Sequence, residues 1–582
     1  MMRLLIVLLV ISNAIAVGAE TDRPNIVFLL ADDLGYTDIA PYGGEVRTPA
    51  LSALAAQGVR FANYHTAANC APARAMLLTG VNNHLAGVPN IPEMLAPEQR
   101  RQANYQGVLG NNVVTVATLL EGAGYHTYMA GKWHLGATPD KLPSRRGFER
   151  TVALMDSGAD NWEHKPYLPI YEDANWFADG ERFRLPEDFY SSQFLIDKTI
   201  EFIDSNIDDS KPFFAYVPFQ AVHIPVQAPQ EFIDRYMGVY DEGWHVLRER
   251  RRTRAIEIGL VPENTEMVDM PSTKDWSALS PERQRYEAKR MAVYAGMIEA
   301  MDFHIGRLIE YLKVKGVYEN TVFVFTSDNG AEASGPDDPT SGATIGVSRL
   351  GYHTDYNRLG LKGSYNTISP SFASAAASPL AYFKFYTGEG GLRVPLIISG
   401  AHVTSAGMTH AFSWATDITP TILSIAGVDQ PGERYGGRPV LPISGKNLSP
   451  ILRGEANRAY EEHESVGYEL TGHAAFFQGD YKLVRNEAPL GDGQWRLYNI
   501  AIDPGEVNNL KEAEPERFQR MLSGYEQFTR ENGVMPLPPG YSQSGQLISN
   551  YLSASLREGI IVLLLTLLIL LPFFVAYRLK RT

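Results

Sequence analysis

Short runs of apolar and β-branched residues recur along the chain, separated by stretches in which apolar residues follow a helical spacing. Such runs are typical of buried strands, and they cover residues 25–30, 212–218, 321–326 and 394–399. Residues 290–313 predict a long amphipathic helix. Residues 419–426 predict a shorter helix with Thr419 as its N-cap and Pro420 at its first position. This alternation predicts an α/β fold in which helices cover both faces of a sheet.

Acidic and amide side chains follow two of the predicted strands at the points where they end. Asp32 and Asp33 come after the first strand, and Asp328 and Asn329 follow the strand at residues 321–326. Ligands of open α/β sheets bind beyond the carboxyl ends of the strands, so we expect both pairs at one edge of the sheet. Their side chains offer only oxygen ligands, which suits a hard cation such as calcium.

Cys70 is the single cysteine of the chain, so no disulfide can form within it. The segment Cys70-Ala-Pro-Ala-Arg74 predicts a helix with Cys70 at its N-terminus, because proline suits a first turn and alanine favours helix. A helix N-terminus favours negative charge, and Arg74 lies about one turn further on. These features indicate anion chemistry at Cys70. The residues alone leave both a nucleophilic thiolate and a buried free thiol open.

The chain has 582 residues, which is too long for one ordinary core, and its pattern changes near residue 431. Beyond that point, residues 479–484 and 495–500 predict antiparallel strands and residues 512–530 a polar amphipathic helix. We expect a catalytic domain over residues 20–430, a smaller subdomain over 431–535 and a linker over 536–558. The basic run at residues 248–254 predicts a solvated helix face.

Both ends of the chain carry membrane signals. Residues 1–19 have an early arginine, an apolar run and small residues, which predicts a signal peptide. Residues 559–577 are apolar and would span roughly 27 Å as a helix, and the basic tail at 578–582 would stay in the cytoplasm. We therefore expect a secreted protein anchored in a membrane, the bacterial inner membrane facing the periplasm. The net charge of −14 argues against nucleic acid as a partner.

The motif Cys-x-Pro-x-Arg at residues 70–74 resembles the modification signature of the sulfatase family, whose members belong to the alkaline phosphatase superfamily. Further segments from about residue 24 to 535 resemble family motifs, namely residues 24–38, 124–136, 326–330, 384–395 and 497–510. Residues 240–248 and 275–280, with the insertion between Asp328 and Lys384, resemble the larger bacterial arylsulfatases. The resemblance implies an alkaline-phosphatase-like mixed sheet flanked by helices, plus a small C-terminal α+β subdomain with an antiparallel sheet.

The resemblance also implies a reaction. Cys70 would be oxidised to formylglycine (3-oxoalanine) by a maturation enzyme, and its hydrated aldehyde would attack a sulfate ester of an aryl, alkyl or carbohydrate alcohol. One calcium ion would be held by side chains of the sheet edge and by the modified cysteine; these are Asp32, Asp33, Cys70, Asp328 and Asn329. Asp328 would also accept the proton of the nucleophile.

The remaining roles fall to cationic residues. Arg74, Lys132 and Lys384 would bind the sulfate oxygens electrostatically. His223 matches the family histidine that protonates the leaving alcohol. His134 matches the histidine that takes a proton from the second hydroxyl, which expels sulfate and regenerates the aldehyde.

Two other functions compete with this prediction. A formylglycine-dependent phosphonate or phosphodiester hydrolase shares the fold and the cysteine motif, but Lys132, His134 and Asn329 are of the sulfatase type. An inactive sulfatase-like receptor for sulfated glycans would have lost its nucleophile or a metal ligand, and the motif residues here are intact.

Overall fold

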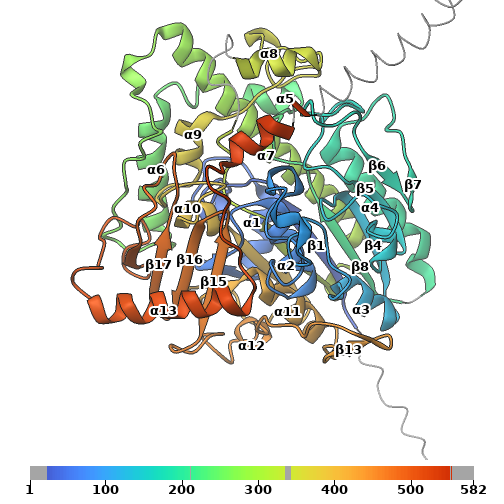
Figure 1. Ribbon diagram of the computed structural model, residues 1–582. Helices are drawn as coiled ribbons and strands as arrows, with labels where there is room; N and C mark the ends of the chain where they lie inside the picture. The colour runs from blue at the N-terminus through green and yellow to red at the C-terminus, as the bar shows by residue number, and fades with distance from the viewer. Residues whose placement is uncertain (1–22, 210, 335–341, 551, 554–582) are drawn as a thin grey trace, which may run out of the picture.

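The computed structural model describes residues 23–209, 211–334, 342–550 and 552–553. Their largest sheet has ten strands in the order β11-β2-β10-β9-β1-β8-β4-β5-β6-β7. Figure 1 labels the part of this sheet from β1 to β7. The ten strands are β1 (Asn25–Ala31), β2 (Val59–Phe61), β4 (His126–Lys132), β5 (Arg150–Leu154), β6 (Trp176–Ala178), β7 (Glu181–Arg182), β8 (Phe213–Pro218), β9 (Thr321–Ser327), β10 (Leu396–Gly400) and β11 (Gly407–Thr409). The central strands β9, β1, β8, β4 and β5 run parallel, while β10 and β6 pair antiparallel at the two sides. The strands expected from the apolar runs, and the mixed α/β fold, are confirmed.

Strand β1 lies at the centre of the sheet and is buried on both faces, as its unbroken apolar sequence requires. Its alternate side chains enter two separate cores. Val27 and Leu29 pack in the core that contains α1 (Pro49–Gln57), α4 (Ser191–Asn206) and α7 (Pro281–Val314). Ile26 and Phe28 pack in the core of α2 (Cys70–Thr79), α3 (Val116–Gly122) and α11 (Ile418–Ile425). The predicted helices on both faces are therefore present.

Helix α7 confirms the long amphipathic helix, but the cap expected for α11 is wrong. Asp417, not Thr419, precedes α11, and the helix begins one residue before Thr419. The Thr419 hydroxyl instead donates to the carbonyl oxygen of Leu77 in α2, at 2.8 Å. This contact joins the two helices, so a tertiary hydrogen bond replaced the local cap.

The predicted antiparallel strands belong to a four-stranded sheet with the order β15-β16-β17-β18. Its strands are β15 (Ser465–Leu470), β16 (His473–Gln478), β17 (Tyr481–Arg485) and β18 (Arg496–Asn499). One face packs on the core of α2 and α11, and the other is covered by α13 (Pro515–Glu531), at the lower left of Figure 1. Because one face of the small sheet belongs to the same core as α2 and α11, the small sheet packs directly against the larger unit. The domain boundaries themselves stay predictions.

Residues 533–550 follow α13 and run along residues 92–105, which include the short 3₁₀ helices η2 (Pro92–Met94) and η3 (Gln99–Arg101). Gln99 donates to the carbonyl of Pro536 at 3.1 Å, and Asn550 donates to the carbonyl of Glu93 at 2.5 Å. Much of the expected linker thus makes contacts with the catalytic part of the chain. The predicted signal peptide and transmembrane helix lie outside the described residues, and no helix within the described part is both long and apolar enough to cross a bilayer.

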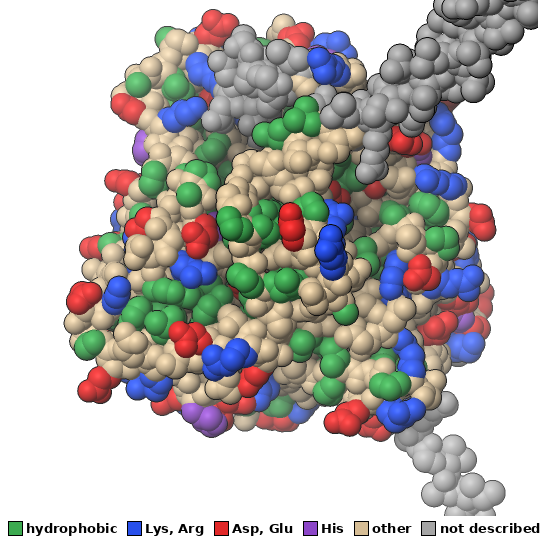
Figure 2. Space-filling view, in the orientation of Figure 1, with side chains coloured by type: hydrophobic (Ala, Val, Ile, Leu, Met, Phe, Trp, Pro, Cys, Tyr) green, Lys and Arg blue, Asp and Glu red, His purple; other side chains and the backbone are tan. Residues whose placement is uncertain are grey.

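The basic run at residues 248–254 has the expected solvated helix face, but its other side is buried. This run lies in α6 (Gly243–Glu257), where Arg248 and Arg251 are buried. Arg251 forms ion pairs with Asp38 at 2.5 Å and Glu45 at 2.8 Å, because that face of α6 packs against the protein. On the face shown in Figure 2, acidic and basic side chains are interspersed. Arg74, Lys132 and Lys384 are buried inside the molecule, where they are paired with carboxylates at the site described next.

Candidate active site

The two predicted acidic pairs meet because their strands are neighbours in register. Ala31 of β1 pairs with Ser327 of β9, and each strand ends there. The Asn329 amide donates to Asp33 at 2.7 Å, and the backbone amide of Asp33 donates to Asp328 at 3.3 Å. The expectation of one shared edge at the carboxyl ends of the strands is confirmed.

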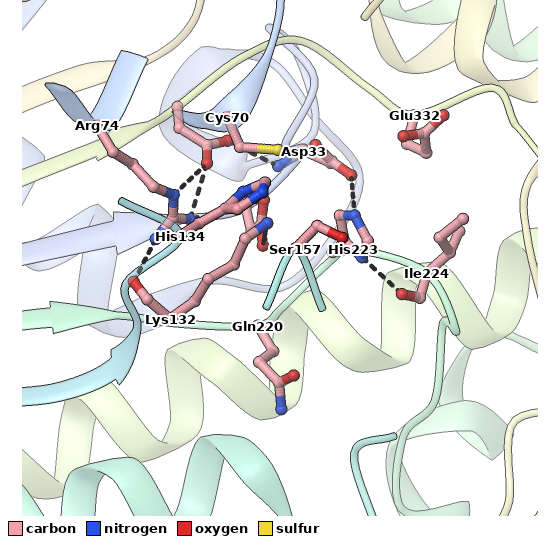
Figure 3. Close-up of polar contacts among 12 residues, drawn as sticks. Asp33, Cys70, Arg74, Lys132, His134, Ser157, Gln220, His223, Ile224 and Glu332 are labelled. Atoms are coloured by element: carbon pink, nitrogen blue, oxygen red, sulfur yellow. Dashed lines mark hydrogen bonds and ion pairs between the residues drawn. The ribbon is translucent and has the colours of Figure 1, made fainter. Parts of the chain in front are cut away.

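Helix α2 begins at Cys70, as its sequence predicts, and brings Arg74 back to this edge. Asn69 is the N-cap, and its side-chain oxygen accepts from the backbone amide of Cys70 at 2.8 Å. Arg74 donates twice to one oxygen of Asp328, at 2.9 and 2.7 Å, and once to the carbonyl of Lys132, at 2.6 Å (Figure 3). Cys70, at 1% exposure, therefore lies at a buried helix N-terminus beside a guanidinium group.

Two lysines complete a cluster of buried cations. Lys132, at the end of β4, forms an ion pair of 2.6 Å with Asp32. Lys384 forms ion pairs with Asp33 at 2.8 Å and with Glu332 at 2.7 Å. Arg74, Lys132 and Lys384 are all almost inaccessible to solvent. Cations in such surroundings act strongly on an anion, because little water screens them.

Two histidines flank this cluster from different strands. His223 follows β8, and its Nδ1–H donates to the carbonyl of Ile224 at 2.5 Å, so Nε2 faces Asp33 at 3.7 Å (Figure 3). Burial, with Lys132 and Lys384, lowers the pKa of His223 well below its usual value. His134 follows β4, and its Nε2 lies 3.5 Å from the carboxylate of Glu93. The structure thus brings every predicted site residue to one place.

The acidic side chains of the site fit a hard cation. The Oδ1 atoms of Asp32 and Asn329 are buried and have no hydrogen-bond partner among the described residues. One side-chain atom each of Asp32, Cys70 and Asp328 lies within 4.8 Å of the others. Burial, together with the charge of Asp328, raises the pKa of Asp32, and burial raises the pKa of Asp33 to about 6. A cation would supply the missing partner and relieve this repulsion.

The environment of Cys70 does not favour a plain thiolate. Burial raises the pKa of its thiol, although Lys132 and Lys384 act in the opposite direction. A reactive cysteine nucleophile would need a lowered pKa and some exposure. The helix N-terminus and the nearby cations are therefore not explained by a thiolate at Cys70.

Two carboxylates of the site had no counterpart among the predicted residues. Glu332 binds Lys384 and could have been suspected from its place just after Asn329. Glu93 contacts His134 and accepts a hydrogen bond from Tyr171. It lies in the short 3₁₀ helix η2 (Pro92–Met94), which carries no apolar periodicity and no motif, so no local signal marked it.

A family model described as Sulfatase matches residues 24–428, and one described as N-sulphoglucosamine sulphohydrolase, C-terminal, matches residues 381–526. The chain belongs to the sulfatase family. It is 38% identical to an arylsulfatase of Klebsiella aerogenes over 441 residues, which cover 75% of this chain and 93% of the relative. It is 36% identical to an uncharacterized sulfatase of Schizosaccharomyces pombe, over 90% of this chain and 96% of the relative.

Solved structures share the fold of this sulfatase. The crystal structure of Ps i-CgsB in complex with k-i-k-neocarrahexaose superposes with a TM-score of 0.62 at 22% identity, covering 92% of this chain and 98% of that chain. A protein bound to its substrate, D-glucosamine-2-N,6-O-disulfate, superposes with a TM-score of 0.56 at 22% identity, covering 88% and 98%. The predicted fold class, the resemblance to arylsulfatases and the assignment as a sulfuric ester hydrolase are confirmed.

Proposed function

We propose that this sulfatase hydrolyses sulfate esters with formylglycine made from Cys70, beside one calcium ion. The observation that carries the proposal is the composition of the buried site. Three cations surround a buried Cys70 at a helix N-terminus, next to oxygen atoms that have no hydrogen-bond partner among the described residues. Such a site suits a small dense anion and a hard cation, and it does not suit a free thiolate.

Calcium would be held by the sheet edge and by the modified residue 70; the protein ligands are Asp32, Asp33, Asp328 and Asn329. When bound, the ion would lower the pKa of a hydroxyl and withdraw charge from sulfate. Burial would raise the pKa of Asp328, but Arg74, acting together with Lys132 and Lys384, keeps it below its usual value. Asp328 is thereby kept as a carboxylate that can bind the cation and accept a proton.

The other residues act on the substrate. Arg74, Lys132 and Lys384 bind the sulfate oxygens in a place from which water is largely excluded. His223 donates a proton to the leaving alcohol from Nε2, since its Nδ1–H is committed to Ile224. Burial and the two lysines disfavour the protonated form of His223, and an anionic ester would favour it by offsetting the lysine charges. His134 then accepts the proton whose loss expels sulfate.

The relatives point to more than one kind of sulfated substrate. The Klebsiella aerogenes relative is an arylsulfatase, and a solved neighbour binds a sulfated glucosamine. We infer an ester of an aryl, alkyl or carbohydrate alcohol. Lys132, His134 and Asn329 favour a sulfate ester over a phosphonate or phosphodiester, and the intact site favours an enzyme over a receptor.

We expect peptide mass spectrometry to find formylglycine at residue 70 when the protein is produced with a formylglycine-generating maturation enzyme. The intact Cys-Ala-Pro-Ala-Arg motif is the reason. The matured protein should then hydrolyse members of a panel of aryl, alkyl and carbohydrate sulfates. An active preparation that carries only unmodified cysteine at residue 70 would contradict the proposal.

Replacing His223 with glutamine should impair turnover according to the leaving group. For alkyl or sugar sulfates, which need a proton on the departing oxygen, we expect a loss of about 10²–10⁴-fold in kcat/KM. For an activated nitrophenyl sulfate, the loss should stay below about 10-fold, because the phenolate leaves unaided. Glutamine at His304, a buried histidine of α7 away from the site, is the control. Equal impairment on every leaving group would remove His223 from the role of acid.

We further propose that residues 559–577 anchor the enzyme in the bacterial inner membrane, with the catalytic part in the periplasm. Deleting residues 556–582 should release soluble, active enzyme, measured as activity in the supernatant after ultracentrifugation. Deleting all residues after Ser542 removes in addition the contact of Asn550 with Glu93, so we expect lower activity from that shorter form. Retention of the longer form in membranes after signal cleavage would show that the anchor lies elsewhere.

A further inference from the structure

The two ring nitrogens of His134 have different surroundings. Nε2 lies 3.5 Å from Glu93 Oε2, a long contact of the kind that catalytic pairs show before substrate binds. Nδ1 is buried and has no hydrogen-bond partner in the part of the chain that the structure describes. The backbone of His134 is also in the left-handed region, at a φ of +55°, which few non-glycine residues adopt.

Glu93 is itself held in place from two sides. Its Oε1 accepts a hydrogen bond from the Tyr171 hydroxyl, which also lies 2.7 Å from the Ser157 hydroxyl. Its backbone carbonyl accepts from Asn550, in the segment that follows α13. Burial would raise the pKa of Glu93, but His134 and the hydrogen bond from Tyr171 lower it below its usual value. Glu93 is thus a fixed carboxylate whose second oxygen is directed at His134.

The same hydrogen-bonded chain ends at Tyr167, which packs beside His223. The Ser157 hydroxyl lies 2.8 Å from the Tyr167 hydroxyl, and the ring of Tyr167 packs edge-on against His223, with centroids 5.1 Å apart. Ser157 lies between the two histidines in the close-up of the site (Figure 3). One network of side chains therefore contacts both His134, the proposed base, and His223, the proposed acid.

We propose that Glu93 is the positioning residue of His134, holding the proton on Nε2 so that Nδ1 presents its lone pair to the reacting group. This inference rests on the proposed function. In the expulsion step, the second hydroxyl of residue 70 gives its proton to Nδ1, its O–H electrons form the C=O bond, and the carbon–oxygen bond to sulfate breaks. The imidazolium so formed is stabilised by the carboxylate, as in other carboxylate–histidine pairs.

The charged groups around His134 decide the direction of a pH effect. Burial lowers the pKa of His134, Glu93 raises it, and Lys132 and Arg74 lower it further. Two more titratable groups, Asp156 and His223, also interact electrostatically with His134. Removing the Glu93 charge leaves the cations unopposed, so the pKa of His134 should fall. The acidic limb of the pH profile for kcat should then move to lower pH, while the plateau drops.

The decisive variant is Glu93→Gln. A glutamine amide can donate to Nε2 and so favour the tautomer with its proton on Nδ1, which cannot act as a base. In protein labelled with ¹⁵N-histidine, with Cys70 unmodified, long-range proton–nitrogen spectra should show Nε2–H at His134 in the wild type and lose this state in Glu93→Gln. The His134 signal is identified by its absence from His134→Ala. This measurement needs no turnover, so it is independent of the maturation at residue 70.

The matured enzyme supplies the second measurement. With a chromogenic aryl sulfate, Glu93→Gln should give a normal burst of phenol followed by a steady state reduced about 10²-fold or more. Glu93→Asp keeps the carboxylate and should recover part of the rate. Glu469→Gln is the matched control, because Glu469 holds the buried His84 at 3.1 Å in a comparable pair that takes no part in the reaction.

An unchanged His134 tautomer in Glu93→Gln, with a steady state within about 2-fold of the wild type, would overturn the inference. An equal loss of rate in Glu469→Gln would overturn it as well, since it would show a structural effect. Failure of the proposed function would look different. In that case, the wild type itself would turn over without formylglycine at residue 70.

Discussion

Serine in place of Cys70 should reduce steady-state sulfate release by on the order of 10⁴-fold or more. Serine has one hydroxyl, so a sulfated serine can be cleared only by water attacking sulfur a second time. The hydrate of formylglycine has a second hydroxyl, whose deprotonation expels sulfate. Serine and formylglycine should therefore differ mainly in the rate of sulfate release, and much less in the rate of the first attack on sulfur.

The assay is pre-steady-state release of phenol from an aryl sulfate, with peptide mass spectrometry of residue 70. The Cys70→Ser variant should release at most one equivalent of phenol and retain a sulfate on the serine. Cys70→Ala, which lacks any hydroxyl, is the matched control and should release none. A serine variant that turns over at a rate near that of the wild type, with its serine intact, would exclude the proposed chemistry.

Replacing Lys482 with methionine should have the largest effect on folding stability. Lys482 of β17 forms ion pairs with Glu389 at 2.9 Å and with Glu506 at 2.8 Å, all of them buried. Removing one partner of a buried ion pair leaves an uncompensated charge and typically costs about 3–5 kcal/mol. The urea midpoint, followed by tryptophan fluorescence, should fall accordingly. Lys446→Met is the control, because Lys446 pairs with Glu464 in partly exposed surroundings, where the expected cost is about 0–1 kcal/mol.

The deficit of Lys482→Met should depend on pH in a defined direction. Burial raises the pKa of Glu506 to about 7 in the native protein, although Lys482 acts against this, and losing the ammonium group should raise it further. A carboxyl whose pKa is higher in the folded state stabilises the fold when protonated, and this stability is lost as the pH rises through that value. The variant should therefore be closer to the wild type near about pH 6 than near about pH 8. A deficit that grows on acidification would contradict this assignment.

The main sheet and part of the site could be predicted because their determinants are local, whereas Lys132, His134, His223 and Lys384 were expected only from the resemblance to the sulfatase family. Buried strands are visible as apolar runs, and the rule that parallel strands share an edge placed Asp32 and Asp328 together. The helix start at Cys70 follows from proline and alanine nearby in the sequence. Arg74 then needed only helix geometry to return to the same site.

The features that could not be predicted depend on contacts between distant segments. Glu93 contacts His134 and Tyr171 from a single-turn 3₁₀ helix that shows no periodicity in the sequence. Arg251 resembles its exposed neighbours in sequence, and only packing of α6 reveals its buried partners. Thr419 would be a sound N-cap by its residue type, yet it hydrogen-bonds to another helix. Such choices follow from tertiary energies that no short window of sequence contains.

The burial of Cys70 sets an order of events in biosynthesis. At 1% exposure, behind its N-cap Asn69, the thiol has no room beside it for another protein. A maturation enzyme would have to act while this segment is still extended, so modification and folding compete in time. The fraction of active molecules would then be decided during a short interval after synthesis. In a chain that folds without the modifying enzyme, Cys70 would remain a thiol. Supplying that enzyme later would restore activity only after the chain is unfolded.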